Sequence, residues 1–264
     1  MVKSLFVAPL LILAGSVAAM PAIARPASSD AARSVSVSQL PVRNIVLVHG
    51  AFADGSGWKP VYDLLTAKGF RVTVVQQPLT SLKDDVAATR RVLSALDGPA
   101  ILVGHSYAGA VISEAGDDPH VRGLVYIAAF QPKVGENIAS LVSQKPAPND
   151  DVVAVDGFLS LKTDRFAQDF AADLPKMQSD FMAHAQKPIA ASAFAEPLQS
   201  AAWENKPSHA ILTTSDHALS PDLQESMYTR AGSTVTRIAA SHAVFLSHPR
   251  EVAAVIETAA REAK

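Results

Sequence analysis

Six short apolar segments alternate with helical patterns along most of the chain, and this alternation constrains the fold more than any other feature. The segments are rich in Val, Ile and Leu with few polar interruptions, which is typical of strands covered on both faces. Strands that alternate with helices favour a parallel sheet wrapped on both sides by right-handed crossovers. We expect the strands at residues 42–48, 70–75, 101–103, 121–129, 210–214 and 234–238.

Helix signals fall between these segments. Pro60 begins an apolar periodic pattern that Gly69 ends, and Ser81 with Asp84 three residues later has the form of a capping box. Further helical patterns follow later strands, the last of them from Pro249. The pattern therefore predicts one α/β domain with a mainly parallel sheet of about six strands, flanked by helices.

The third strand runs into a sharp turn, Gly-His-Ser-Tyr-Ala-Gly at residues 104–109. A serine hydroxyl is a poor nucleophile unless the backbone presents it to a base, and a strand-to-helix turn with small flanking residues does so. The usual pattern is Gly-x-Ser-x-Gly, whereas Ala108 stands here in place of the second glycine. Alanine is still small enough for close helix–strand packing, so we expect a working, slightly strained turn that presents Ser106.

Polar residues follow three other strands of the predicted sheet. His49-Gly50-Ala51 comes after the first strand, Asp216 after the fifth and His242 after the last. Because chemistry in such sheets gathers at the carboxyl ends of the strands, we expect these residues to lie around Ser106.

Three segments, VHGAFADGSGW, VGHSYAG and GSTVTRIAASHAV, resemble the α/β-hydrolase superfamily. They are most similar to its small-cap branch of esterases, plant methylesterases and hydroxynitrile lyases, and the resemblance extends from the first strand to the C-terminus. It implies an α/β-hydrolase fold in which Ser106 is the nucleophile, His242 the base and Asp216 the acid that orients the imidazole. Ala51 and Tyr107 match the residues whose backbone N–H groups form the oxyanion hole.

Each assignment has a simpler alternative. A serine after glycine is often only a turn residue, and His242 could instead cap polar groups at a strand end. Asp216 could cap the following helix, with Asp222 as the acid in its place. We interpret His105 as structural support within the turn and His49 as a hydrogen-bonding anchor of the oxyanion loop. The other histidines are scattered and no His-Glu-x-x-His stretch occurs, so we expect no metal and no cofactor.

One long stretch breaks the alternation. No clear strand is recognisable between about residues 131 and 206, where prolines separate helix-like pieces. A compact domain rarely holds a structureless loop of that length, so we expect an inserted helical cap. Most of its Phe and Met side chains are expected to pack the cap against the core, and a minority to line a pocket.

The first 24 residues have the form of a secretory signal peptide, with Lys3, an apolar run to about Ala19 and the A-x-A sequence that ends at Ala24. The run is shorter than the roughly 20 apolar residues of a membrane anchor, which is the weaker alternative. Residues 25–40 are expected to be a flexible lead-in to a single domain at 41–264. We therefore expect an exported protein, periplasmic or secreted after cleavage near Ala24.

Composition and net charge exclude several classes of function and site. The formal net charge of −2 offers no basic field for nucleic acid, and the absence of Cys excludes disulfides and thiolate metal sites. The resemblance and the cap imply a carboxylesterase-type serine hydrolase that cleaves a medium-sized, partly apolar ester through an acyl-enzyme. The acyl and alcohol groups and the oligomeric state stay open.

Two alternatives use the same scaffold. Hydroxynitrile lyases of this branch carry threonine where this chain has Gly50 and lysine where it has Ala243, so both positions count against a lyase. The other alternative is a ligand-binding protein that keeps the triad without turnover. Export and the absence of an obvious interaction segment count against it.

Overall fold

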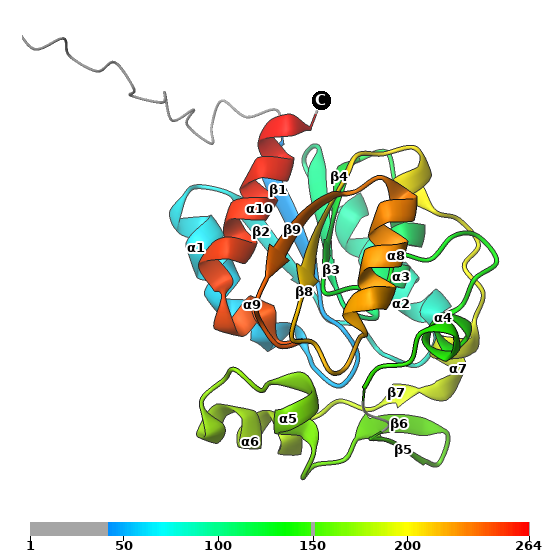
Figure 1. Ribbon diagram of the computed structural model, residues 1–264. Coiled ribbons are helices and arrows are strands. Elements are labelled where there is room, and N and C mark those ends of the chain that lie inside the picture. Colours follow the sequence, from blue (N-terminus) through cyan, green and yellow to red (C-terminus); the bar gives the residue numbers. More distant parts are fainter. Residues whose placement is uncertain (1–41, 149–150, 264) are drawn as a thin grey trace, which may run out of the picture. The chain divides into compact units, whose positions relative to one another are not determined.

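The computed structural model describes residues 42–148 and 151–263, and it contains the predicted parallel sheet. Six parallel strands follow the order β2-β1-β3-β4-β8-β9 (Figure 1). In the register of the sheet, Val48 pairs with both Val75 and Gly104, so the first three strands end level with one another. The strands are β1 (Asn44–Val48), β2 (Arg71–Val75), β3 (Ala100–His105), β4 (Val121–Ile127), β8 (Ser208–Thr213) and β9 (Thr234–Ile238).

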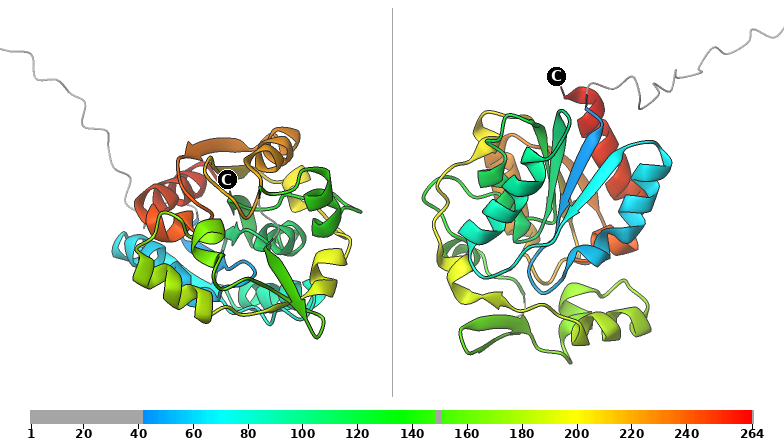
Figure 2. Two further views of the ribbon diagram at one scale, coloured as in Figure 1. Left: turned by 60° about the horizontal axis from the view of Figure 1, so that its bottom comes forward. Right: turned by 180° about the vertical axis from the view of Figure 1, so that it is seen from behind.

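Helices cover both faces of this sheet (Figures 1 and 2). Successive strand residues point to opposite faces, so an apolar strand has side chains to bury on both of them. On β1, Ile45 and Leu47 pack in one buried cluster and Val46 and Val48 in the other. The first cluster lies under α1 (Lys59–Ala67), α9 (Val244–Ser247) and α10 (Pro249–Glu262). The second lies under α2 (Leu82–Ser94), α3 (Ala108–Ala115) and α8 (Pro221–Ala231).

Two of the predicted helix ends have the local structure that the sequence predicts. The Ser81 hydroxyl accepts a hydrogen bond from the Asp84 backbone N–H at 3.0 Å and so caps α2. Gly69 has φ +94° just beyond α1, a conformation that L side chains rarely adopt. A 3₁₀ turn, η2 (Gly55–Trp58), leads from the loop after β1 into α1.

The segment between β4 and β8 forms the cap. The sequence predicts a helical cap, whereas this segment contains both helices and strands. It contains α4 (Ile138–Gln144), α5 (Phe166–Phe170), α6 (Lys176–His184), α7 (Ala191–Ala195) and the 3₁₀ turn η3 (Ala202–Glu204). It also contains an antiparallel sheet of β5 (Val152–Val155), β6 (Phe158–Leu161) and β7 (Ile189–Ala190). The expectation that no strand lies here is therefore wrong.

A tight hairpin explains the strands of the cap. Asp156 and Gly157 join β5 to β6 with φ of 50° and 82°, the positive values of a type I′ turn. The strands are short and largely exposed, so their side chains show neither a long apolar run nor a clear alternation. The Asp-Gly pair was the available signal.

The predicted signal peptide (1–24) and lead-in (25–40) lie outside the described residues, and both stay predictions. Within the described part of the chain, no helix combines the length and the apolar character that crossing a membrane requires.

Close packing of α3 generates a stability prediction at Gly109. A Cβ atom added there would lie 1.8 Å from the carbonyl oxygen of Phe130, far inside van der Waals contact. We expect Gly109→Ala to lower the free energy of unfolding by about 3 kcal/mol or more, because helix and backbone must separate. Urea denaturation followed by circular dichroism measures this change.

Gly98→Ala is the matched control. A Cβ atom at Gly98 would meet only the Asn44 side chain, at 3.8 Å. We expect that variant to unfold within about 0.5 kcal/mol of the parent protein. Equal stability of the two variants would contradict the assigned contact.

Candidate active site

Ser106 occupies a strained turn between β3 and α3. Its φ is +54°, in the left-handed region that non-glycine residues seldom adopt. Its backbone N–H donates to the carbonyl of Ile127 (3.2 Å), and its carbonyl accepts from the N–H groups of Gly109 (2.9 Å) and Phe130 (3.1 Å). These hydrogen bonds hold the backbone in that conformation, and the side chain keeps limited access, with Ser106 8% exposed.

The alanine that departs from the usual pattern is accommodated. Ala108 is fully buried at the start of α3, whereas the close contacts fall on the glycines at either side. A Cβ atom at Gly104 would lie 2.7 Å from the Ala108 carbonyl oxygen. The turn therefore requires glycine at 104 and 109, and a methyl group at 108 does not block it.

His242 and Asp216 form a buried pair at the ends of β9 and β8. The Nδ1 atom of His242 lies 2.7 Å from Oδ2 of Asp216, and both residues are about 1% exposed. Because the carboxylate accepts, Nδ1 carries a hydrogen, which leaves Nε2 as the ring nitrogen that can accept a proton. Four further donors fix the carboxylate: the Thr213 hydroxyl, the Gln224 amide and the backbone N–H groups of Ala218 and Leu219.

The structure thus pairs His242 with Asp216 and leaves the alternative acid apart. Asp222 is exposed on the first turn of α8, where its charge lies near the positive end of the helix. The Gln224 side chain, two residues further on, is the group from α8 that contacts Asp216, at 3.0 Å.

His105 connects His242 to the serine turn. Its Nε2 donates to the backbone carbonyl of His242 at 3.0 Å, and the two rings lie 4.6 Å apart. Burial, with a smaller effect of His242, holds the pKa of His105 well below its ordinary value, so the ring is a neutral donor. Since His105 directly precedes Ser106, this bond ties the backbone of the loop that carries His242 to the serine turn.

The loop after β1 lies against the same turn. His49 donates from Nδ1 to the Gly50 carbonyl (2.9 Å) and accepts at Nε2 from the Gln77 backbone N–H (3.0 Å), as expected of an anchor. Burial lowers the pKa of His49 to about 4 and keeps it neutral. A Cβ atom at Gly50 would lie 2.9 Å from Cβ of Ser106, so only glycine permits this approach.

Two backbone donors stay available beside Ser106. In the described parts of the chain, the N–H groups of Ala51 and Tyr107 donate no hydrogen bond to the protein. Both residues are buried, at 2% and 0% exposure. Unpaired buried amides are rare, and a ligand oxygen is the natural acceptor for these two.

The cap holds the loop that carries His242, which the sequence did not reveal. The Phe170 carbonyl accepts from the Ala243 N–H (2.9 Å), and the Phe170 ring lies 4.8 Å from the His242 ring. The Asp173 carboxylate accepts from the backbone N–H of Ser241 at 3.0 Å. An aspartate in an insertion gave no signal, because its partner lies 68 residues away.

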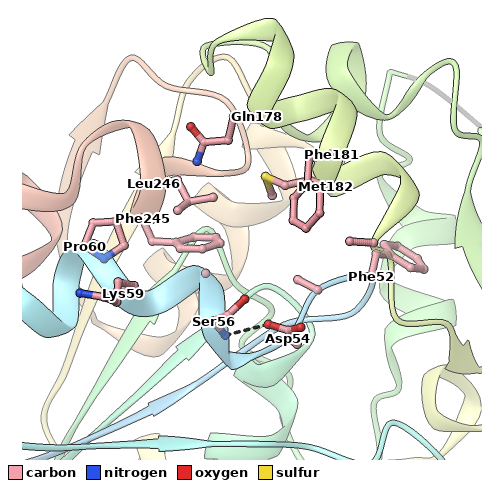
Figure 3. A pocket seen from close by; sticks show the side chains of 13 residues that line it. Phe52, Asp54, Ser56, Lys59, Pro60, Gln178, Phe181, Met182, Phe245 and Leu246 are labelled. Atoms are coloured by element: carbon pink, nitrogen blue, oxygen red, sulfur yellow. Dashed lines mark hydrogen bonds between the residues drawn. The ribbon is translucent and has the colours of Figure 1, made fainter.

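An apolar cavity of about 360 Å³ opens between the cap and the loop after β1 (Figure 3). Phe181 and Met182 of α6 line it from the cap, and Phe52 and Phe245 from the core. Neither Ser106 nor His242 lines it, although Phe52 follows Ala51 directly and the Phe245 ring lies 4.6 Å from the ring of His105. Phe181 is 71% exposed although it lines the cavity.

Across residues 42–148 and 151–263, no three His, Asp or Glu side chains gather in an arrangement that could hold a metal ion.

Known proteins are similar to this chain in sequence or in architecture. A carbendazim hydrolyzing esterase of Nocardioides sp. is 32% identical over 136 residues, which are 46% of this chain and 56% of that protein. A pyrethroid hydrolase structure from Sphingobium faniae superposes with a TM-score of 0.72 at 23% identity, covering 84% of this chain and 98% of that one. The Arabidopsis methylesterase MES16 superposes at 0.69 with 21% identity, covering 83% and 98%.

A model of the alpha/beta hydrolase family matches residues 45–255, from β1 into α10. The matched range includes the serine turn, the His242–Asp216 pair and the whole cap. The likeness to the methylesterase structure is one of fold, and it agrees with the α/β-hydrolase fold expected from the sequence. The chain belongs to the alpha/beta hydrolase family.

Proposed function

We propose that this protein is a serine hydrolase that cleaves carboxylic esters through an acyl-enzyme intermediate. The observation that carries the proposal is the buried 2.7 Å hydrogen bond between His242 and Asp216. The backbone carbonyl of His242 accepts in turn from the ring of His105, which directly precedes Ser106 in the strained turn. The names of its relatives, an esterase and a pyrethroid hydrolase among them, agree with this reaction class.

The first half-reaction forms the acyl-enzyme. The Ser106 hydroxyl oxygen attacks the ester carbonyl carbon while Nε2 of His242 accepts its proton. Asp216 stabilises the imidazolium that results, and five hydrogen bonds already orient its carboxylate. The tetrahedral intermediate then expels the alkoxide, which takes the proton from His242 and leaves as the alcohol.

The second half-reaction restores the enzyme. Water attacks the acyl carbon, His242 accepts a proton from that water, and Ser106 leaves with the proton returned. In both intermediates the carbonyl oxygen becomes an oxyanion. The N–H groups of Ala51 and Tyr107 are its proposed donors, because they face no other acceptor among the described residues.

The cap favours a medium-sized, partly apolar ester. A cavity of about 360 Å³ lies beside the oxyanion loop, and its walls are mainly aromatic and aliphatic side chains (Figure 3). Lys59, Asp54 and Gln178 line its edge and provide a few polar positions. Pockets of this kind bind the apolar part of a small molecule and orient it by a few polar contacts.

A lyase of the hydroxynitrile type fits less well. A threonine at position 50 would place its Cβ atom 2.9 Å from Cβ of Ser106 and 3.0 Å from the His105 ring. At position 243 the alanine is fully buried against the cap, so no lysine ammonium stands there. Neither the binding-protein alternative nor the lyase is favoured by a specific contact.

Ser106→Ala tests the nucleophile. We expect kcat for p-nitrophenyl butyrate to fall by on the order of 10⁴ or more, because the acyl-enzyme no longer forms. Burst-phase kinetics and intact-mass spectrometry of the parent enzyme should also show one acyl group on Ser106.

The control is Ser208→Ala, which removes an equally buried serine hydroxyl at the start of β8. Its kcat should stay within about threefold of the parent value. Retained esterase activity in Ser106→Ala would disprove the serine mechanism.

Phe181→Ala tests the cavity as the position of the apolar part of the substrate. Loss of this ring should raise KM about tenfold for a naphthyl ester and leave KM for a methyl ester nearly unchanged, because one aromatic contact contributes about 1–2 kcal/mol. Met177→Ala is the matched control, since Met177 lies on the same helix, is 86% exposed and does not line the cavity. Equal KM changes for both esters would contradict the assignment.

A further inference from the structure

The residue after the nucleophile is held by its side chain as well as by its backbone. The Tyr107 hydroxyl donates to Oδ2 of Asp85 on α2 at 2.7 Å, and both residues are fully buried. The Tyr107 ring also stacks on Phe194 of α7, with centroids 5.8 Å apart and planes 18° apart. The orientation of the Tyr107 peptide, which carries a proposed oxyanion donor, therefore depends on where its phenol is anchored.

The same carboxylate holds a second loop. Oδ1 of Asp85 accepts from the backbone N–H of Leu79 at 2.8 Å, and Leu79 has φ +62°. Two residues earlier in this loop, the Gln77 N–H donates to Nε2 of His49 and the Gln77 side-chain amide donates to the His49 carbonyl. His49 leads directly into Gly50 and Ala51, where the other proposed donor lies.

Asp85 thus connects both halves of the proposed oxyanion hole. One oxygen reaches the Tyr107 side through a phenol, and the other reaches the Ala51 side through Leu79, Gln77 and His49. The cap joins the same loop, because the Ala190 N–H donates to the Leu79 carbonyl at 2.9 Å.

This buried acid is costly for the fold. Burial raises the pKa of Asp85 to about 6, against the opposing effects of the Leu79 and Tyr107 hydrogen bonds. Lys187 of the cap is the cation that faces it, and Asp84 of its own helix adds a like charge. Because the folded pKa lies above the unfolded value of 3.8, this group favours folding fully below about pH 3.8, and that contribution is lost as pH rises through about 6.

The phenol stays a donor over the same pH range. Burial, with the charges of Asp85, Glu196 and Glu114 around it, raises the pKa of Tyr107 far above its ordinary value. At neutral pH the ionised Asp85 carboxylate opposes folding, yet it accepts hydrogen bonds from two groups next to the site. Proteins retain such an unfavourable buried charge mainly at positions that function requires.

We propose that Asp85 is a positioning residue that holds the Tyr107 and Ala51 backbone N–H groups in the orientation that an oxyanion needs. The inference rests on the proposed esterase function and adds a group that does not touch the substrate. Since oxyanion donors act on the transition state more than on the bound ester, loss of Asp85 should lower kcat more than it changes KM.

Asp85→Asn is the direct test, with p-nitrophenyl butyrate as substrate. We expect kcat to fall about 10- to 100-fold, less than the loss of a whole oxyanion donor, while KM changes less than threefold. Unfolding at pH 8 should need as much urea as in the parent, because the variant removes a buried charge. Unchanged kcat with lowered stability would mean a purely structural role.

The pH profile separates positioning from packing. The acid limb of kcat in the parent should contain an ionisation near pH 6 that Asp85→Asn removes. An acid limb that is the same in both proteins would overturn the proposal.

Tyr107→Phe keeps the test decisive if Asp85→Asn folds poorly. It removes the hydroxyl that Asp85 accepts from and keeps the backbone N–H, so kcat should also fall about tenfold. In the double variant the losses should not multiply, because both changes break one link. Multiplied losses, or an unchanged kcat in Tyr107→Phe, would contradict the link.

Tyr126→Phe is the matched control. Tyr126 is another buried phenol, and its hydroxyl is 2.9 Å from Ser113 Oγ, outside the loops that carry the two donors. Its kcat should stay within about twofold of the parent. If Ser106→Ala abolishes turnover while the Asp85 and Tyr107 variants keep full kcat, this inference alone fails; if Ser106→Ala keeps full activity, the proposed function fails first.

Discussion

The left-handed backbone at Ser106 is the constraint on which the rest of the site depends. A non-glycine residue at φ +54° persists only where its surroundings hold it. Here β3 leads into the turn and α3 leads out of it. The end of β4 accepts from the Ser106 N–H at Ile127, and the segment after β4 donates to the Ser106 carbonyl from Phe130. Gly109 has room for no side chain against the Phe130 carbonyl, so the position of α3 and the conformation of the turn are set together.

The sheet and the gathering of polar residues at its edge could be predicted from local patterns. Buried parallel strands read as near-continuous apolar runs, and each of the six appears within a few residues of its expected place. His49 directly follows β1, and Asp216 and His242 lie in the loops that begin where β8 and β9 end, so one topological rule brings all three to the same edge of the sheet. That rule needs no knowledge of side-chain contacts.

Residues whose role depends on distant partners gave no such signal. In the sequence, Asp84 and Asp85 are both typical acidic residues of a helix's first turn. In the structure Asp84 is exposed, whereas Asp85 is buried and bonded to Tyr107, 22 positions away. Periodicity places both in the first turn of α2 and does not separate them. The strands of the cap were missed for another reason: they are short and largely exposed, so the Asp156–Gly157 pair carried the information that their side chains lacked.

The cap contacts the loops that carry the two sides of the proposed chemistry. At one side Phe170 and Asp173 bond to the backbone around His242, and at the other Ala190 bonds to the loop that Asp85 holds. The cavity and the proposed oxyanion donors are therefore not separable by domain in this fold. A substitution in the cap that alters its packing should move the proposed base or the proposed oxyanion donors along with the cavity wall, and so change kcat together with KM.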